Sequence, residues 1–224
     1  MLNDNKSLIN LVKKLQPLRK KRYEIIVVDG GSEEILSDRE QAYFDQYVLS
    51  NPGRAKQMNA GANDASGAIL WFLHADSLFD HKAVDESLQQ LETSDRCWGR
   101  FDVKLSGDDW RLNIIAFFMN WRSALTGVAT GDQGIFVYKS VFEQVNQFPD
   151  IPIMEDIALS KLLLKHSRPL RIKKHLVTSG RRWLTHGVFK TVTLMWILRL
   201  GYFLGVKPER LARFYKPCTN NSIN

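Results

Sequence analysis

The chain has 224 residues, 44% of them hydrophobic and 25% charged, a composition typical of a folded globular domain and not of a disordered chain. Its 31 Lys and Arg against 24 Asp and Glu leave a net charge of +7, which favours phosphorylated partners or an anionic membrane surface. No nucleic acid partner is expected, because no helix-turn-helix, zinc-knuckle or RNA-recognition signature accompanies this charge. The two cysteines, Cys97 and Cys218, are too distant for a metal-ligand spacing and argue against a disulfide framework.

The first half of the chain alternates apolar strand patterns with helical ones. The predicted strands lie at 23–32, 46–50 and 68–74, and the predicted helices at 5–15, 54–65 and 82–91. Short connections between alternating strands and helices are typical of a parallel sheet covered on both faces. We therefore expect an α/β fold with a mixed, mostly parallel sheet.

The second half of the chain is less regular. A half-exposed strand at 99–107 and an apolar stretch at 113–121 precede a buried strand at 131–139, a helix at 154–165, a strand at 169–179 and a C-terminal apolar helix at 188–206. No uncharged apolar stretch reaches the ~20 residues that span a bilayer. We predict one domain over residues 1–187 with a helical extension over residues 188–224.

Two of the predicted strands end in acidic residues. Asp29 follows "EIIVV", and His74 and Asp76 close the run "AILWFLHADS" at 68–77. Ligands of open α/β sheets bind outside the carboxyl ends of the strands. Because residues i and i+2 of a strand face the same way, His74 and Asp76 are expected to project together, where a carboxylate holds a hard divalent cation. The alternative is that both aspartates only cap turns.

The stretch "GRAKQMNAGANDASG" at 53–67 contains neither a P-loop nor a G-x-G-x-x-G motif. Arg54 is nevertheless expected at a helix N-terminus, where a fixed cation and free backbone N–H groups together favour a diphosphate. The alternative is a solvent-facing helix whose alanines pack on the sheet.

Glu155 and Asp156 stand at the start of the helix predicted over 154–165. The helix dipole favours acids at this position without any catalytic role. A functional interpretation is that the helix start lowers the pKa of these acids and keeps one ionised as a proton acceptor.

Seven blocks carry a resemblance to a known family: "EIIVVDGGS", "GRAKQMNAGA", "ILWFLHADS", "WGRFDVKLSG", "ATGDQGIFV", "FPDIPIMEDIALSKLL" and "SGRRWLTHG". Together they resemble a family-2 glycosyltransferase of the GT-A fold, and within it the subgroup called selenodomain-associated transferase 2. The resemblance implies transfer of a glycosyl group from a nucleotide-diphosphate sugar, with Mg²⁺ or Mn²⁺ as cofactor.

The resemblance assigns roles to residues near the predicted strand ends. Asp29, in a block that includes Gly30, is implied to recognise the nucleotide base, and Arg54 to lie near the diphosphate. The triplet from His74 to Asp76 stands where the family has its Asp-x-Asp motif, so Asp76 is the implied metal ligand. His74 replaces the first Asp of the motif and takes its place in the nucleotide-sugar site.

The later blocks imply the catalytic residues. Glu155 and Asp156 match the family's acidic pair, in which the Asp resembles the general base of an inverting reaction. Arg182 and Trp183 match the end of the Q-x-x-R-W motif and are implied to bind the nucleotide-sugar. The glutamine of that motif is missing, which predicts non-processive transfer. His186 is the second candidate metal or diphosphate ligand.

The chain departs from the family at its start. Family members open with a strand before an "LNE" turn, whereas this chain opens "MLNDNKS", so the family's first strand is expected to be absent from these residues. Two other functions therefore stay open: a sugar nucleotidyltransferase, and a non-catalytic remnant that binds nucleotide.

The apolar segment 188–204 carries Lys190 and Arg199 and predicts either a helix lying on anionic lipid or a helix packed on its own domain. The first alternative suits a lipid-linked acceptor, and the acceptor itself is unknown from sequence. We expect a cytoplasmic protein, with the inner face of the membrane as its peripheral location in the first case.

Overall fold

The strands form two sheets in the computed structural model, which describes residues 3–21, 23–34 and 36–215. The two-stranded sheet pairs β1 (Ile26–Asp29) with β2 (Gln46–Leu49) in parallel. The four-stranded sheet has the order β3 (Ile69–Trp71), β5 (Phe136–Tyr138), β4 (Trp98–Ser106) and β6 (Leu170–Ser179). The α/β class and the mixed sheet are confirmed. No strand precedes β1 among the described residues.

The pairing is more mixed than the alternating pattern indicates. β4 and β6 run parallel, but β5 runs antiparallel to both β3 and β4. Between β4 and β5 the chain passes through the helix at Trp110–Thr126 and the turn at Gly131–Gln133, and this connection brings β5 back against the direction of β4.

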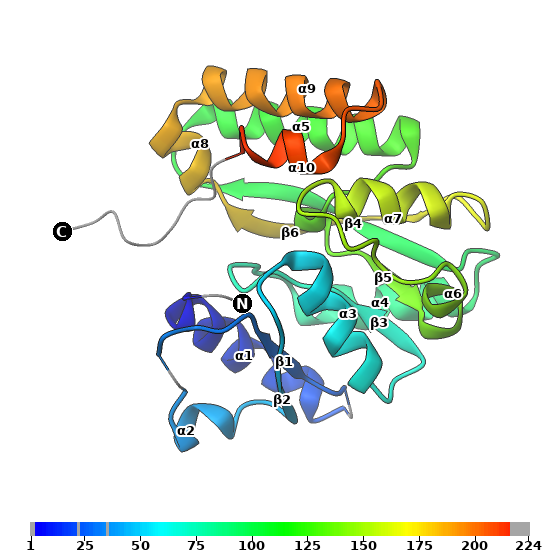
Figure 1. Ribbon diagram of the computed structural model, residues 1–224. Coiled ribbons are helices and arrows are strands. Elements are labelled where there is room, and N and C mark those ends of the chain that lie inside the picture. The colour runs from blue at the N-terminus through cyan, green and yellow to red at the C-terminus, as the bar shows by residue number, and fades with distance from the viewer. Residues whose placement is uncertain (1–2, 22, 35, 216–224) are drawn as a thin grey trace.

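Helices lie on both sides of the strands, as predicted (Figure 1). Each segment predicted to be helical is a helix. The short helices α2, α6 and α8 were not predicted, because so few residues show no clear 3.6-residue period. The described helices are α1 (Asn5–Arg19), α2 (Asp38–Gln41), α3 (Arg54–Asp64), α4 (His81–Glu92), α5 (Trp110–Thr126), the 3-10 turn η1 (Gly131–Gln133), α6 (Lys139–Gln144), α7 (Glu155–Leu163), α8 (Arg181–His186), α9 (Val188–Phe203) and α10 (Pro208–Ala212).

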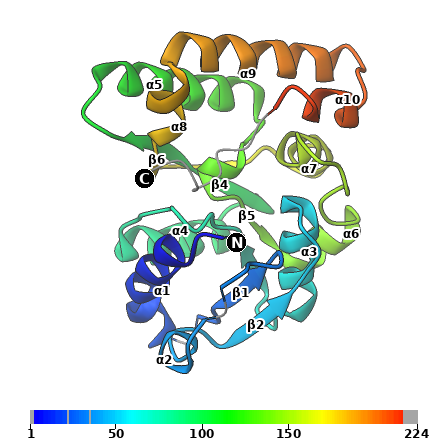
Figure 2. The same ribbon diagram turned by 60° about the vertical axis from the view of Figure 1, so that its left-hand side comes forward.

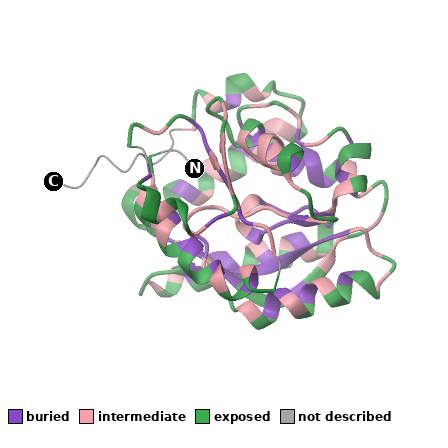
Figure 3. Cartoon of the chain, turned by 90° about the horizontal axis from the view of Figure 1, so that it is seen from below, coloured by how far each residue is buried: buried purple, intermediate pink, exposed green. Residues whose placement is uncertain are grey.

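The core is divided by the four-stranded sheet. On one face Leu91 of α4 packs with Phe101 and Phe136 of the sheet. On the other face α3 and α7 pack on β3 and β5, with Ala55 and Leu159 fully enclosed. Figure 3 shows the buried residues gathered along the strands, with exposed residues on the outward turns of the helices. Two covered faces explain why β3 and β5 are apolar along their length.

Gly99 allows β4 to sit close to its neighbours. A Cβ at this position would lie 2.3 Å from the Phe136 ring and 2.7 Å from the Leu170 carbonyl oxygen. Since real Cβ atoms do not approach other atoms so closely, only glycine permits β5 and β6 to flank β4 here.

The C-terminal helices pack on the domain through α7. Leu198 of α9 and Leu211 of α10 share one buried cluster with Ile157 of α7. Figures 1 and 2 both show α9 running alongside α5 at one side of the molecule. The division at residue 187 stays a prediction. None of the described helices combines the length and apolarity needed to cross a membrane.

Candidate active site

Asp156 lies in the first turn of α7, and two backbone N–H groups hold its carboxylate. Its Oδ2 accepts a hydrogen bond from the Gly131 N–H at 2.9 Å, and its Oδ1 accepts one from the Ile157 N–H at 2.7 Å. The prediction that the acidic pair begins a helix is confirmed, because α7 begins at Glu155. The residue before it, Met154, has a left-handed φ of 70°. Such a conformation costs a non-glycine residue about 1–3 kcal/mol and is found preferentially at functional sites.

His74 and Asp76 lie in a loop and not on a strand. β3 ends at Trp71, and the Ser77 N–H donates to the His74 carbonyl oxygen at 3.0 Å, which closes a turn around the pair. The prediction that the strand extends to His74 is therefore wrong, and the i and i+2 argument does not apply to this pair. The apolar run continues past the strand because Phe72 and Leu73 pack into the core, and the Phe72 N–H still donates to the Ile135 carbonyl oxygen at 2.9 Å.

The His74 imidazole nevertheless reaches the Asp156 carboxylate region. A Cβ on Gly131 would lie 2.4 Å from His74 Nε2, so the ring fills the space beside this glycine. His74 and Asp156 also line the same small hollow, whose other walls are Met58, Phe72, Leu73, Gly131, Ile135 and Phe148. The loop after β3 and the start of α7 thus meet at one point.

His74 is neutral at neutral pH. Burial and the positive charge of Arg54 lower its pKa from 6.5 to about 4, although the charges of Asp76 and Asp156 act in the opposite direction. A neutral imidazole is both a hydrogen-bond donor and a potential metal ligand. The side chain therefore adds no positive charge to the site.

Arg54 is the cation that faces this group. α3 begins at Arg54, which confirms its predicted place at a helix N-terminus. The residue as a whole is exposed, but its charged end is largely desolvated, which by itself lowers the pKa. The net pKa is raised because the electrostatic effects of Tyr215, Glu155, Asp132 and Asp156 outweigh desolvation.

Glu155 behaves differently from its neighbour. It is 5% exposed, and burial together with the charge of Asp156 raises its pKa from 4.5 to about 7, against the lowering effect of Arg54. The expectation that the helix start lowers the pKa of these acids is wrong for Glu155, because desolvation exceeds the effect of the helix terminus. The pair therefore combines one acid that is half protonated near neutral pH with a second carboxylate beside it.

Two arginines on the apolar helices complete the charged cluster, and sequence reasoning did not assign either to the site. Burial first, and the charge of Arg199 next, lower the pKa of Arg122 in α5 to about 10, against the raising effect of Asp156. Arg199 in α9 also has a lowered pKa from burial, opposed by the charges of Asp156 and Asp132. Nε and Nη2 of Arg122 are buried and have no hydrogen-bond partner among the described residues. A basic residue inside a helix that is otherwise apolar is the signal that could have found both.

Asp29 and Gly30 lie beside the first turns of α3. Asp29 is 2% exposed and accepts hydrogen bonds from the Ser32 hydroxyl at 2.6 Å and from the Tyr47 hydroxyl at 2.7 Å. Burial raises its pKa, but these hydrogen bonds outweigh burial and leave the pKa lowered. Gly30 faces α3, because a Cβ there would lie 3.0 Å from Gln57 Nε2. The end of β1 is thus one helical turn from Arg54.

The metal prediction rests on Asp76 and His186. The side chain of His186 lies outside the part of the molecule that the structure describes. Among the described residues, no three His, Cys, Asp or Glu side chains come together in a way that could hold a metal ion. Asp76, whose charge acts on the neutral His74, supplies at most two donors with it. This donor set fits a cation that shares its ligands with a diphosphate and water, which is the usual mode for Mg²⁺, and not one held by protein alone.

The remaining predicted residues belong to α8. The side chain of Arg182 is not among those described. Trp183 packs with the apolar cluster of β4 and α5 that includes Val103 and Leu112. No described contact joins Trp183 to the charged cluster around Asp156, so its part in binding stays a prediction.

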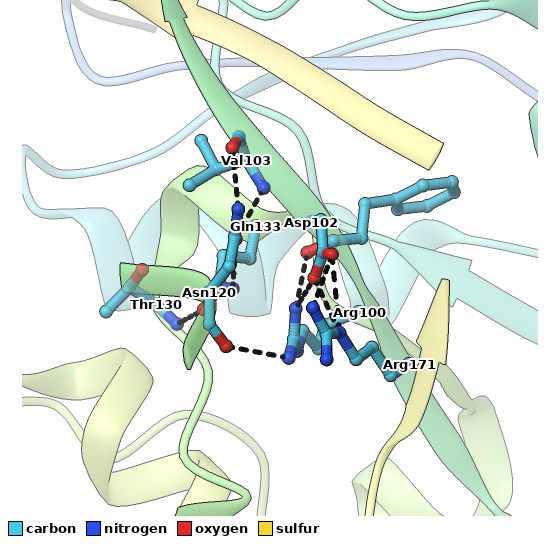
Figure 4. A network of polar contacts seen from close by, with 8 residues as sticks. Arg100, Asp102, Val103, Asn120, Thr130, Gln133 and Arg171 are labelled. Atoms are coloured by element: carbon cyan, nitrogen blue, oxygen red, sulfur yellow. Dashed lines mark hydrogen bonds and ion pairs between the residues drawn. The ribbon is translucent and has the colours of Figure 1, made fainter. Parts of the chain in front are cut away.

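A buried ionic group supports β4 next to the site. Asp102 pairs with Arg100 and with Arg171, whose Nη2 lies 2.8 Å from Oδ2 (Figure 4). Burial raises the pKa of Asp102, and the two arginines outweigh it and keep the pKa low. The group sits where the β4–β6 register shifts, between Phe101 and Asp102. The Arg171–Asp102 pair therefore links β6 to β4 at this irregularity.

A second chain of hydrogen bonds runs from β4 to the turn that holds Asp156. Asn120 of α5 donates to the Val103 carbonyl at 2.9 Å and accepts from the Val103 N–H at 2.8 Å. Gln133 donates to Asn120 Oδ1 at 3.5 Å and accepts from the Thr130 N–H at 3.2 Å (Figure 4). The η1 turn is thereby fastened to the sheet.

Comparisons with known proteins agree with this fold. Residues 1–145 match the family described as glycosyl transferase family 2. The chain therefore belongs to glycosyltransferase family 2. The matched segment contains Asp29, Arg54, His74 and Asp76 and ends before Asp156. No curated protein matches the chain.

Solved structures of glycosyltransferases share the architecture. S. aureus TarS, residues 1–349, has a TM-score of 0.61 at 14% identity, covering 80% of this chain and 58% of its own. The mannosyltransferase PcManGT from Pyrobaculum calidifontis, in complex with GDP-Man and Mn²⁺, has a TM-score of 0.57 at 16% identity, covering 98% and 64%. Glucosyl-3-phosphoglycerate synthase from Mycobacterium tuberculosis, in complex with Mn²⁺, UDP and phosphoglyceric acid, has a TM-score of 0.57 at 15% identity, covering 80% and 66%.

These likenesses establish the GT-A fold. The chain spans about three fifths of the length of the first two of these relatives. Their identities of 14–16% leave the donor and the acceptor of this chain open.

Proposed function

We propose that this protein transfers a glycosyl group from a nucleoside-diphosphate sugar to an acceptor hydroxyl, with inversion and without processivity. One observation carries the proposal: the Asp156 carboxylate, fixed by two backbone N–H groups, shares a hollow with His74 and lies in the field of Arg54. A held carboxylate beside a cluster of cations suits a base that works next to a departing diphosphate.

The proton and the electrons are accounted for by residues of this chain. The acceptor oxygen bonds to the anomeric carbon as the bond from that carbon to the diphosphate oxygen breaks, and the electron pair leaves with the diphosphate. Asp156 accepts the hydroxyl proton on a lone pair not used by the N–H groups of Gly131 and Ile157. Arg54 binds the departing diphosphate.

Glu155 serves this proton transfer indirectly. With a pKa of about 7, Glu155 is half protonated near neutral pH, because burial and the nearby Asp156 disfavour its ionised form. The buried acid therefore adds only part of a negative charge beside the carboxylate that reaches the hollow.

The donor site extends from Asp29 and Gly30, for the nucleotide base, to His74 and Asp76. Two relatives described above are complexes with a nucleotide or nucleotide-sugar and Mn²⁺, and this supports Mg²⁺ or Mn²⁺ here. When bound by Asp76, such a cation neutralises charge on the diphosphate. Arg182, Trp183 and His186 of α8 remain candidates for the same site, and the selenodomain-associated transferase 2 subgroup remains part of the proposal.

The test is release of nucleoside diphosphate from a panel of UDP-, GDP- and dTDP-sugars with Mn²⁺ or Mg²⁺. Asp156→Asn is expected to lower turnover by roughly 10²–10⁴-fold, the usual contribution of a general base. Asp95→Asn is the matched control, because the Asp95 side chain is 83% exposed. Equal turnover by the two variants contradicts the role of Asp156.

Two other outcomes overturn the proposed reaction. Formation of a nucleotide-sugar from sugar 1-phosphate and nucleoside triphosphate identifies a nucleotidyltransferase. Thermal stabilisation by nucleotide together with Mn²⁺, with no turnover of any donor, identifies a non-catalytic binder.

A further inference from the structure

The large apolar side chains that remain exposed are concentrated on one part of the molecule. Sixteen such residues are exposed among those described, and six belong to α5 and five to α9. Leu49 is the single member of this set that precedes Trp110. Soluble monomers seldom expose contiguous apolar areas of this kind unless another surface covers them.

Each of the two helices presents its exposed residues as a stripe. On α5 they recur at steps of four, three, one, three and four residues: Trp110, Ile114, Phe117, Phe118, Trp121 and Leu125. On α9 they recur at steps of seven, one, three and three residues: Phe189, Trp196, Ile197, Leu200 and Phe203. These steps keep side chains on one face of a helix. We call the two stripes together the α5–α9 outer face.

The inner faces of the same helices are already buried. Leu112 and Ile115 of α5 pack on β4, and Leu198 of α9 packs on α7. Figures 1 and 2 show the two helices side by side, with the sheets on one side of them. The outer face is therefore a second apolar surface, opposite the one that packs on the domain. A helix that is apolar all round is normally covered on all sides.

The charge next to this face is mostly positive. The exposed basic residues on α9 and on the segments that adjoin it are Arg181, Lys190, Lys207, Arg210 and Arg213, and Glu209 is the exposed acid among them. At the start of α5, Asp108 is an exposed acid and Asp109 pairs with Arg111. An apolar, aromatic surface with a surplus of basic residues beside it is complementary to a bilayer of anionic lipids.

We propose that the α5–α9 outer face docks on an anionic lipid bilayer, with both helices lying in the plane of the interface. Indole rings favour the boundary between lipid headgroups and acyl chains. We therefore expect the exposed tryptophans of this face to lie at that boundary: Trp110, Trp121 and Trp196. A second copy of the chain is a poorer partner, since two basic surfaces would face each other. None of the described helices could cross the bilayer, which agrees with a peripheral position.

Docking on this face brings the candidate catalytic carboxylate near the membrane. Arg122 and Arg199 stand on α5 and α9, and each interacts electrostatically with Asp156. The acceptor is then a hydroxyl carried by a lipid. This last step rests on the proposed function, whereas the docking itself does not.

The experiment is co-sedimentation of the full chain with vesicles of phosphatidylglycerol or of phosphatidylcholine, at low and at high salt. The protein is expected to pellet with the anionic vesicles, less with the neutral ones, and less at high salt, where charge attraction is screened. Binding that is equal for both lipids and independent of salt contradicts the electrostatic part of the proposal.

Trp196→Glu and Phe118→Glu test the face itself, with Leu49→Glu as the matched control. Trp196 is 71% exposed and Leu49 72% exposed, but Leu49 lies on β2, outside the face. Each face variant is expected to lower the vesicle-bound to free ratio by about tenfold or more, since it places a charge in the lipid interface. The control is expected to leave the ratio unchanged. Equal pelleting of Trp196→Glu and Leu49→Glu overturns the proposal.

Size-exclusion chromatography with light scattering tests the alternative that a second copy of the chain binds the α5–α9 outer face. A dimer that Trp196→Glu converts to monomer, with no vesicle binding by the wild type, assigns the face to self-association and overturns the membrane proposal. Thermal stabilisation by nucleotide with Mn²⁺ is expected to be equal in Trp196→Glu and wild type. If the protein fails to bind vesicles, only the membrane proposal is overturned and the proposed function is unaffected. If the wild type fails to bind nucleotide, only the proposed function is affected and the vesicle result still holds.

Discussion

His74 occupies the space that a side chain at Gly131 would need, with Nε2 only 2.4 Å from the position of a Cβ there. The Gly131 N–H also holds Asp156, so this one residue positions both the imidazole and the carboxylate. Gly131→Ala is expected to displace His74 or the η1 turn. Because misplacing a reacting group by about 1 Å costs roughly 100-fold in rate, we expect a loss of that size in turnover of a nucleotide-sugar.

Gly67→Ala is the control for this substitution. A Cβ at position 67 would meet its nearest neighbour, the Ile69 carbonyl oxygen, at 3.6 Å, which is an ordinary contact. Its turnover and melting temperature are expected to match the wild type. Full activity in Gly131→Ala would show that the ring and the turn can separate without consequence.

Glu155 and His74 give the stability of the protein opposing pH dependences. The pKa of Glu155 is raised from 4.5 to about 7, so the folded state binds the extra proton and stability falls as pH rises through this interval. The pKa of His74 is lowered from 6.5 to about 4, so the unfolded state binds the extra proton and stability rises as pH rises through this interval. In the wild type, the loss of stability caused by Glu155 and the gain caused by His74 nearly cancel over the pH range in which both intervals overlap.

Glu155→Gln removes the titrating carboxyl group that lowers stability as pH rises. The unfolding free energy of the variant is expected to increase by about 2 kcal/mol from ~pH 5 to ~pH 7, because only His74 still titrates there, while that of the wild type stays nearly level. Urea denaturation at the two pH values measures both quantities. A variant whose stability stays level over this range would mean that His74 is not held in its neutral form by the fold.

Tertiary packing buries the guanidinium of Arg122, although its position in α5 alone does not require this. Its guanidinium is buried beside Arg199, and its Nε and Nη2 have no hydrogen-bond partner among the described residues. Arg122→Met is expected to raise the unfolding free energy by about 1 kcal/mol, since a buried charge without a hydrogen-bonded counterion is costly. Donor turnover is expected to fall by about tenfold, because an anionic reactant loses a nearby cation.

Denaturation and donor turnover of Arg122→Met are compared with those of Arg39→Met, an exposed arginine in α2. A functional role predicts opposite signs for stability and activity in Arg122→Met and no change in the control. A variant that is less stable and fully active would assign Arg122 a purely structural role.

Local sequence patterns predict where a helix starts when the preceding residues clearly end another segment. Arg54 and Glu155 both stand at the first residue of a helix, as predicted, because the preceding Gly53 and the loop before Met154 end the apolar pattern of the previous segments. The boundaries of β3 and β5 were not predictable in the same way. Phe72 and Ile135 extend the apolar runs by packing in the core, where burial does not require a strand.

The site itself was only partly visible in the sequence. Asp29, Arg54 and Asp156 are candidates from sequence because strand ends and helix starts have local signatures, and their roles stay predictions. The pKa of Glu155 and the contact of His74 with Gly131 depend on segments that are more than 50 residues apart, for which one sequence gives no spacing rule. Arg199 was read as part of a membrane-facing charge, and its inward orientation follows only from the packing of α9 on α7.

Asn120 is expected to be the polar residue of α5 on which the fold depends most. It is 8% exposed, and its amide exchanges two hydrogen bonds with the backbone of Val103 in β4 and accepts a third from Gln133. Asn120→Ala leaves the Val103 N–H and carbonyl oxygen buried without these partners, which costs about 1–3 kcal/mol for each unsatisfied group. We expect the unfolding free energy to fall by about 2–4 kcal/mol, measured by urea denaturation.

Asn113→Ala in the same helix changes an exposed asparagine and is expected to alter stability by no more than about 0.5 kcal/mol. Equal destabilisation by the two substitutions would mean that helix propensity, and not the link to Val103, sets the cost.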